Sequence, residues 1–363
     1  MSADLARAER FAARFGLRLP VLMAPMAGAS PVALAAAVAD AGGMGALGAL
    51  LMEPPAIADW VAAYRRAGDR PLQINLWVPD PPPARDAAHE AALRAFLARH
   101  GPPVAAEAGD ARPPDFAAQC EALLAARPTA ASSIMGLFPE RVVQRLKDAG
   151  IAWFANVTTL GEARAAAAAG ADVIVAQGAE AGGHRGAFDA ARARDEAVGL
   201  FALLPQVVDA VDVPVVATGG IADARGVAAA LLLGASAVQL GTALLRTPEA
   251  GVAPCWAAAL ATLVPEATRL TRAFSGRWGR AIATDYVRAA AAPDAPPPAP
   301  YPVQRGLTAA MRQAAEAAGD LRHLQAWAGQ AAALAHADSP RVTLPRLWAD
   351  ARNLLAGGAS EAA

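Results

Sequence analysis

The residues best suited to chemistry lie in one loop, residues 176–186, which reads AQGAEAGGHRG. The loop follows the β-branched run VIV at residues 173–175, which is typical of a strand. Glycine has no Cβ and tolerates positive φ, so such a loop lets the backbone come close to a phosphate group. His184 is the one imidazole in the loop, and an unperturbed imidazole exchanges its proton near neutral pH. The loop therefore predicts a phosphate-bearing ligand, with His184 facing a substrate.

Two later segments have the same character, ATGGIAD at residues 217–223 and QLGT at residues 239–242. Each follows an apolar run and leads into helical sequence. A phosphate bound there would receive backbone N–H groups and the positive end of a helix dipole. Phosphate sites after consecutive late strands are common in (β/α)8 barrels. These two segments are therefore better placed than the histidine loop to hold the phosphate itself.

Neutral amides dominate the remaining polar positions at the ends of predicted strands. Gln73, Asn75, Gln177 and Gln239 can each donate and accept hydrogen bonds. Such a set suits a heterocycle that mixes donors and acceptors, for example an isoalloxazine ring. It suits a metal ion poorly, and the sequence offers no carboxylate pair or His/Cys cluster, so no metal site is expected.

The elements that must position these residues alternate along the chain. Eight short strand-like runs each precede Ala-rich helical sequence, and they occupy residues 21–25, 44–48, 72–77, 132–136, 151–156, 171–177, 214–217 and 235–240. Eight strand–helix pairs predict a (β/α)8 TIM barrel, whose active sites form at the carboxyl ends of the strands. A doubly wound sheet is the alternative, because one sequence does not reveal strand order.

Two parts of the chain depart from this alternation. Residues 78–128 are expected to form a helical insertion, because plain connections between elements are much shorter. Beyond residue 245 the pattern changes to helices without strands, at 248–264 and 306–335. We therefore expect a barrel over residues 1–245 and a helical lid or side domain over residues 246–363, whose last helices pack back on the barrel.

The composition limits the classes of function. Hydrophobic residues make up 55% of the 363 residues and the formal net charge is −1. This indicates a large buried core and gives no electrostatic case for binding nucleic acid or an anionic membrane. The apolar run at 228–240 is broken by polar residues and reads as helix, turn and strand rather than a membrane span. Two distant cysteines, Cys120 and Cys255, and the absence of a signal-peptide pattern fit a reducing cytoplasm.

Seven segments together resemble the nitronate monooxygenases, formerly called 2-nitropropane dioxygenases. They are the loop at 176–186, MAPMAGAS at 23–30, QINLW at 73–77, ATGGIAD at 217–223, QLGTALL at 239–245, TRAFSGR at 271–277 and, more loosely, YPVQ at 301–304. The resemblance implies a barrel that holds FMN without a covalent bond. It implies the oxidation of alkyl nitronates, for example propionate 3-nitronate, by O₂ to a carbonyl compound and nitrite.

The resemblance also implies roles for single residues. His184 would be the catalytic residue, acting as a base towards a nitroalkane or holding an anionic nitronate. Ser275 and Tyr301 would line the substrate pocket. The family's lysine near this tyrosine is missing from Gln304-Arg305-Gly306, which leaves the preferred nitronate open. A monomer and a homodimer both remain possible. The FMN contacts carried over by motif position are Ala24, Met26, Asn75, Gln177, Gly182, Gly183, Gly219, Gly220, Gln239, Gly241 and Thr242.

Two other functions fit the same residues. An FMN-dependent reductase of quinones or enoyl thioesters, driven by NAD(P)H, would use the same kind of barrel. A non-redox phosphate-binding barrel would use the glycine loops alone. Within the histidine loop, Glu180 is expected to cap a helix or to pair with Arg185 rather than act as a catalytic acid.

Overall fold

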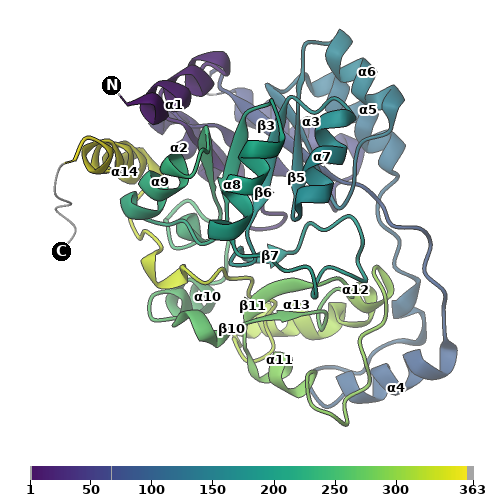
Figure 1. Ribbon diagram of the computed structural model, residues 1–363. Helices are drawn as coiled ribbons and strands as arrows, with labels where there is room; N and C mark the ends of the chain where they lie inside the picture. Colours follow the sequence, from purple (N-terminus) through teal and green to yellow (C-terminus); the bar gives the residue numbers. More distant parts are fainter. Residues whose placement is uncertain (1, 67, 358–363) are drawn as a thin grey trace.

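The computed structural model describes residues 2–66 and 68–357 (Figure 1). Its centre is a sheet of eight parallel strands in the order β1-β9-β8-β6-β5-β4-β3-β2. A parallel bridge between Leu22 and Met44 joins the two ends of this order, so the sheet closes into a barrel. The predicted (β/α)8 barrel is confirmed, and the doubly wound alternative is excluded. The strands are β1 (Val21–Met23), β2 (Gly45–Gly48), β3 (Leu72–Trp77), β4 (Ala130–Ile134), β5 (Ala152–Val157), β6 (Val173–Gln177), β8 (Val215–Thr218) and β9 (Ala237–Leu240).

Helices surround the barrel, as expected for apolar strands that must be covered on their outer face. Seven of them each follow one barrel strand: α2 (Val32–Ala41), α3 (Pro54–Arg65), α5 (Phe116–Ala126), α6 (Glu140–Asp148), α7 (Leu160–Ala168), α8 (Leu200–Ala210) and α9 (Ala224–Leu232). Helices α4 (Ala87–Leu97) and η1 (Ala106–Asp110) come between β3 and α5, and β7 (Gly183–His184) comes between β6 and α8. The eighth place is taken by α14 (Pro340–Leu355), which packs against both α9 and α2. The chain therefore leaves the barrel after β9 and returns to complete it with its last helix.

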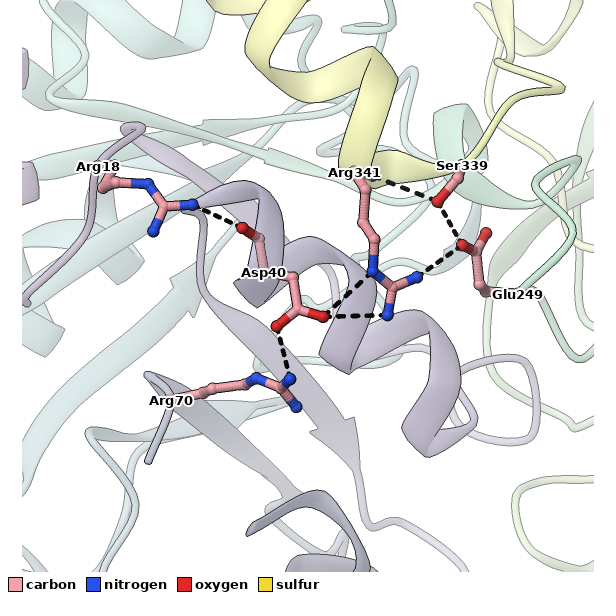
Figure 2. A network of polar contacts seen from close by, with 6 residues as sticks. All are labelled: Arg18, Asp40, Arg70, Glu249, Ser339 and Arg341. Atoms are coloured by element: carbon pink, nitrogen blue, oxygen red, sulfur yellow. Dashed lines mark hydrogen bonds and ion pairs between the residues drawn. The ribbon is translucent and has the colours of Figure 1, made fainter. Parts of the chain in front are cut away.

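The seam between α14 and α2 is held by a network of charges (Figure 2). Arg341, near the start of α14, donates two hydrogen bonds to Asp40 on α2, at 3.0 and 3.1 Å, and one to Glu249 at 3.1 Å. Arg70 pairs with the other oxygen of Asp40 at 2.6 Å, and Ser339 bonds to Glu249. Each carboxylate in the seam thus meets at least one guanidinium.

The interior of the barrel has an apolar end and a polar end. Side chains alternate across a strand, so residues two apart share a face. At the amino end Leu22, Met44, Phe154 and Val173 form one cluster with Phe11 of α1 (Ala3–Arg14), which plugs this end. Towards the carboxyl end the inward positions are polar: Gln73, Asn75, Ser132, Asn156, Gln177, Thr218 and Gln239.

A cap covers the carboxyl end of the barrel and is drawn below it in Figure 1. Its helices come from two separate parts of the chain that share one hydrophobic cluster, with Leu93 and Phe96 from the insertion packed near Tyr286, Leu307 and Met311. The elements are α4 (Ala87–Leu97), η1 (Ala106–Asp110), α10 (Pro254–Leu260), η3 (Pro265–Ala267), α11 (Asp285–Ala289), α12 (Val303–Leu307) and α13 (Ala309–Ala318), with η2 (Thr242–Leu244) and η4 (Ala332–Leu334) at its junctions. Because α5 packs on α3 and β3 as a barrel helix does, we propose that the inserted segment ends before α5.

The prediction of helices without strands beyond residue 245 is wrong. Two strands, β10 (Thr268–Thr271) and β11 (Gly279–Ile282), form an antiparallel sheet with β7 (Gly183–His184). Both strands are short and carry polar residues, so they show no clear hydrophobic alternation. β10 and β11 are close in sequence, whereas β7, the second partner of β11, is distant in sequence.

The helix predicted over residues 306–335 is also wrong in extent. Helix α13 ends at Ala318, because Gly319 adopts a left-handed conformation with φ of 62°. An irregular segment follows, residues 320–331, which crosses the cap and pairs at Trp327 with Ala281 of β11. No helix within residues 2–66 and 68–357 has both the length and the apolar character of a membrane span.

Candidate active site

A cavity of about 360 Å³ lies at the carboxyl ends of the barrel strands, under the cap. His184 lines it, as does every residue that motif position assigned to FMN: Ala24, Met26, Asn75, Gln177, Gly182, Gly183, Gly219, Gly220, Gln239, Gly241 and Thr242. The fold therefore brings residues from most of the chain length to one space.

One end of the cavity is built from backbone that only glycine can provide. Gly219 and Gly220 have φ of 109° and 70°, a region that L side chains rarely adopt. A Cβ on Gly182 would lie 2.5 Å from the Gly329 nitrogen and 2.8 Å from Thr242 Oγ1. Helix α9 begins directly after this loop, so the loop and the first turn of the helix supply N–H groups. This end suits a phosphate group.

The floor of the cavity contains buried polar atoms that lack partners. Gln73 donates to Gln239 Oε1 at 3.4 Å, but its own Oε1 is buried and unpaired, as is Nδ2 of Asn156, within the described residues. The Nδ2 of Asn75 does have a partner, because it donates to Ser132 Oγ at 2.9 Å. An unpaired buried polar group costs about 1–3 kcal/mol. A ligand with both donors and acceptors, such as the ring system of a flavin, would recover this cost, so the residues present fit a flavin nucleotide.

The side chain of Gln177 holds the histidine loop. Its Nε2 donates to the His184 carbonyl at 3.1 Å, and its Oε1 accepts from the Gly186 nitrogen at 2.8 Å. Arg185 donates to the Gln177 carbonyl at 2.6 Å and to the Thr158 carbonyl at 3.1 Å, which ties the loop to β5 and β6. Gln177 is thus a support of the loop as well as part of the cavity wall.

Glu180 caps a helix, as expected. Both of its carboxylate oxygens accept from the Leu200 nitrogen at 2.9 Å, at the first residue of α8. Arg185 bonds to carbonyls instead of to Glu180. The carboxylate is engaged in structure, which leaves His184 as the proton-exchanging group of this loop.

His184 sits on β7, where it is opposite Gly279 of β11. Its Nε2 lies 2.7 Å from Ser275 Oγ. The Ser275 hydroxyl can donate its proton to the Arg277 carbonyl, 3.3 Å away. Ser275 Oγ can then accept a hydrogen bond from His184 Nε2–H. Nδ1 then carries the free lone pair, and it has no hydrogen-bond partner among the described residues.

The surroundings of His184 keep its ring neutral. The rings of Trp77 and Trp327 flank it, each with its centroid 4.8 Å away. Burial, followed by the guanidinium groups of Arg305 and Arg277, lowers the pKa of His184 to about 3. At neutral pH the imidazole is therefore an uncharged acceptor and donor rather than a cation.

Ser275 and Tyr301, which motif position assigned to the substrate pocket, lie behind the cavity wall. Ser275 is buried and contacts the cavity through His184. Tyr301 stacks on Trp77, with ring centroids 4.9 Å apart and planes 12° apart. Each therefore supports a residue that lines the cavity.

Sequence reasoning missed several residues of the wall that matter for its chemistry. Trp77 is two positions from Asn75 on the same strand, so the alternation of side chains could have found it. Trp327, Arg305 and Arg312 also line the cavity and come from the cap. The YPVQ segment next to Arg305 pointed to the pocket, but no local pattern marked these three side chains. Their place depends on how the cap folds over the barrel.

Comparison with known proteins identifies relatives of this chain. The family described as nitronate monooxygenase matches residues 9–342. A nitronate monooxygenase of Paraburkholderia phytofirmans is 41% identical over 326 residues, 88% of each chain. One of Pseudomonas aeruginosa is 39% identical over 332 residues, 90% of this chain and 94% of the relative.

Two solved structures are similar over almost the whole chain. Nitroalkane oxidase from Streptomyces ansochromogenes has a TM-score of 0.85 and 36% sequence identity, covering 95% of this chain and 99% of its own. FabK from Thermotoga maritima has a TM-score of 0.74 and 25% identity, covering 96% and 97%.

Proposed function

Because this chain belongs to the nitronate monooxygenase family, we propose that it uses FMN to oxidise alkyl nitronates with O₂, giving a carbonyl compound and nitrite. The family is one of flavin-dependent oxidoreductases. The observation that carries the proposal is a neutral, firmly oriented His184 in the same cavity as a glycine-built phosphate end and an amide floor. The family match weighs against the reductase and the non-redox barrel.

The residues that would hold FMN fall into two groups. Gly219, Gly220, Gly241 and Thr242 would receive the phosphate, because their backbone leaves room for it. The unpaired amides of the floor would bind the ring, as would Asn75, Gln239 and the backbone near Ala24 and Met26. When bound, FMN supplies the transfer of electrons between the nitronate and O₂.

His184 is proposed to handle the substrate's proton. With Nε2–H held by Ser275, Nδ1 accepts the proton from the carbon next to the nitro group of a neutral nitroalkane. A preformed nitronate has already lost that proton, so the ring then only orients it. Trp77 and Trp327 hold the imidazole in one plane and keep water from it.

We also propose that the protein acts as a monomer or a homodimer on a small nitronate and O₂. Propionate 3-nitronate is one candidate substrate. A cytoplasmic setting is supported by Cys120 and Cys255, which are both free.

The test is the reaction of the FMN-reconstituted protein with ethyl nitronate in air. Nitrite and acetaldehyde should form, and anaerobic nitronate should change the flavin absorbance. If NAD(P)H bleaches the flavin rapidly and nitronate has no effect, the protein is a reductase. If the purified protein takes up no FMN, both redox functions are wrong.

A further inference from the structure

Two half-buried arginines of the cap, Arg305 and Arg312, face the cavity, and their partners differ from those of the buried arginines. Arg277 pairs with Asp80 at 2.7 Å. Arg185 and Arg280 donate to backbone carbonyls, at 2.6 and 2.9 Å. Neither Arg305 nor Arg312 forms an ion pair with a carboxylate of the described residues, although both line the same cavity as His184.

Arg312 is held in place by neutral acceptors. Its Nε donates to Thr308 Oγ1 at 3.2 Å and its Nη2 to the Arg305 carbonyl at 3.0 Å. These bonds fix the guanidinium beside the backbone of α12 without neutralising it. Arg305 itself donates no side-chain hydrogen bond within the described residues, so its guanidinium is the group left to meet a ligand.

This arrangement is unfavourable without an anion. Burial lowers the pKa of Arg305, and burial together with Arg305 lowers the pKa of Arg312 to about 10. Taking a charged group out of water costs free energy unless a partner of opposite charge accompanies it. Glu316 also lines the cavity, but it is exposed and forms no ion pair with either arginine in the described chain.

The substrate supplies the missing charge. A nitronate carries its negative charge on two oxygens joined to one nitrogen, which match the fork of a guanidinium in shape. The nitroalkane from which it derives has the same skeleton and no net charge. His184 is neutral and does not discriminate between the two by charge.

On the basis of the proposed function, we propose that Arg305, supported by Arg312, is the specificity-determining residue that selects the anionic nitronate over the neutral nitroalkane. Arg305 contacts the charged oxygens of the substrate, and Arg312 fixes the backbone of α12 and adds a second positive charge.

The first test compares Arg305→Gln with Arg305→Lys and with the wild-type holoenzyme, using ethyl nitronate and nitroethane. Loss of a hydrogen bond to a charged group should raise KM for the nitronate about 10- to 100-fold in Arg305→Gln. KM for nitroethane should change less than about threefold, and lysine should restore part of the nitronate affinity. An equal rise for both substrates, or no rise for the nitronate, overturns the proposal.

Arg269 provides the matched control, because it is an exposed arginine of the cap outside the cavity. Arg269→Gln should leave KM for both substrates unchanged. If it raises KM for the nitronate as much as Arg305→Gln does, the effect is one of overall charge and the assignment is wrong.

A second measurement needs no turnover and separates this proposal from the proposed function. Nitrate is a planar anion that resembles the head of a nitronate, and its binding to the holoenzyme can be followed by tryptophan emission, since Trp77 and Trp327 line the cavity. Nitrate should bind the wild type and bind Arg305→Gln about tenfold more weakly or worse. Equal binding to both overturns the anion site even if nitronate is oxidised. Inactivity towards nitronate with intact, Arg305-dependent nitrate binding overturns only the reaction.

Discussion

The seam between α14 and α2 and the wall of the cavity both contain arginines, but the two regions treat the charge differently. In the seam, Arg341 meets Asp40 and Glu249 (Figure 2). In the cavity, Arg305 and Arg312 meet no carboxylate of the described chain. A guanidinium paired with a carboxylate stabilises the fold, whereas an unpaired guanidinium at a cavity can bind an anionic ligand. Two amides within the cavity differ in a similar way. Asn75 donates a hydrogen bond to Ser132, whereas the side-chain oxygen of Gln73 has no partner in the described chain.

The largest effect should follow from changing the cavity's proton-exchanging group. His184→Asn removes the base but keeps a polar side chain, so turnover of neutral nitroethane should fall about 10²- to 10⁴-fold. Preformed ethyl nitronate should be affected far less, because its proton is already gone. FMN content, measured by absorbance, should stay near that of the wild type. If the variant loses FMN, His184 belongs with the structural residues and the contrast between the two regions weakens.

The next effect concerns the glycine-built end of the cavity. Gly182→Ala places a Cβ against the Gly329 nitrogen, 2.5 Å away, so the backbone must shift. The dissociation constant of FMN, measured by fluorescence quenching, should rise at least about tenfold, which corresponds to about 1.4 kcal/mol. Gly161→Ala is the control, because its Cβ would meet only Thr159 Oγ1 at 3.9 Å. Unchanged FMN affinity in Gly182→Ala would show that this end does not approach the cofactor.

A substitution in the seam between α14 and α2 should lower stability and leave substrate binding unchanged. Asp40→Asn leaves Arg70 and Arg341 without their shared carboxylate. Because these side chains are partly exposed, each lost ion pair should cost only about 0.2–1 kcal/mol of the free energy of unfolding. Urea unfolding measures this loss. KM for ethyl nitronate should stay within about twofold of the wild type, since the seam lies on the outside of the barrel. A large rise in KM would couple the seam to the site.

The smallest effect is expected in the pH dependence of kcat/KM for nitroethane. The pKa of His184, about 3, lies below the ordinary imidazole value of about 6.5, so the ring stays neutral between pH 7 and pH 5. The ratio kcat/KM for nitroethane should therefore change little over this range, whereas a base with an ordinary pKa would lose most of its activity. A fall in kcat/KM with a midpoint near pH 6.5 would mean that the His184 ring is solvated.

The lowered pKa of His184 also makes the free energy of unfolding depend on pH. The unfolded chain takes up a proton on this histidine below about pH 6.5, and the folded chain does so only near its own pKa. The contribution of the neutral ring to stability is therefore complete above pH 6.5 and is lost as the pH falls towards 3.

The sequence by itself determined the barrel and most of the cavity floor. Eight strand–helix pairs are local patterns, and the alternation along β3 alone places Gln73, Asn75 and Trp77 on one face. The glycine loops are also local, because a left-handed φ at Gly219 and Gly220 is a property of the residue type. Strand ends of a barrel must meet at one face, so these local signals were enough to place His184 near the amides.

Only the tertiary structure decided what surrounds the histidine. The pairing of β7 with β11, the contact of Nε2 with Ser275 and the place of Trp327 join residues about 90 to 140 positions apart, and no local pattern encodes such contacts. The same holds for α14, which completes the barrel from the end of the chain, and for Arg305, which reaches the cavity because the two parts of the cap share one hydrophobic cluster. The chemistry of the site can be read locally, but its selectivity depends on long-range packing.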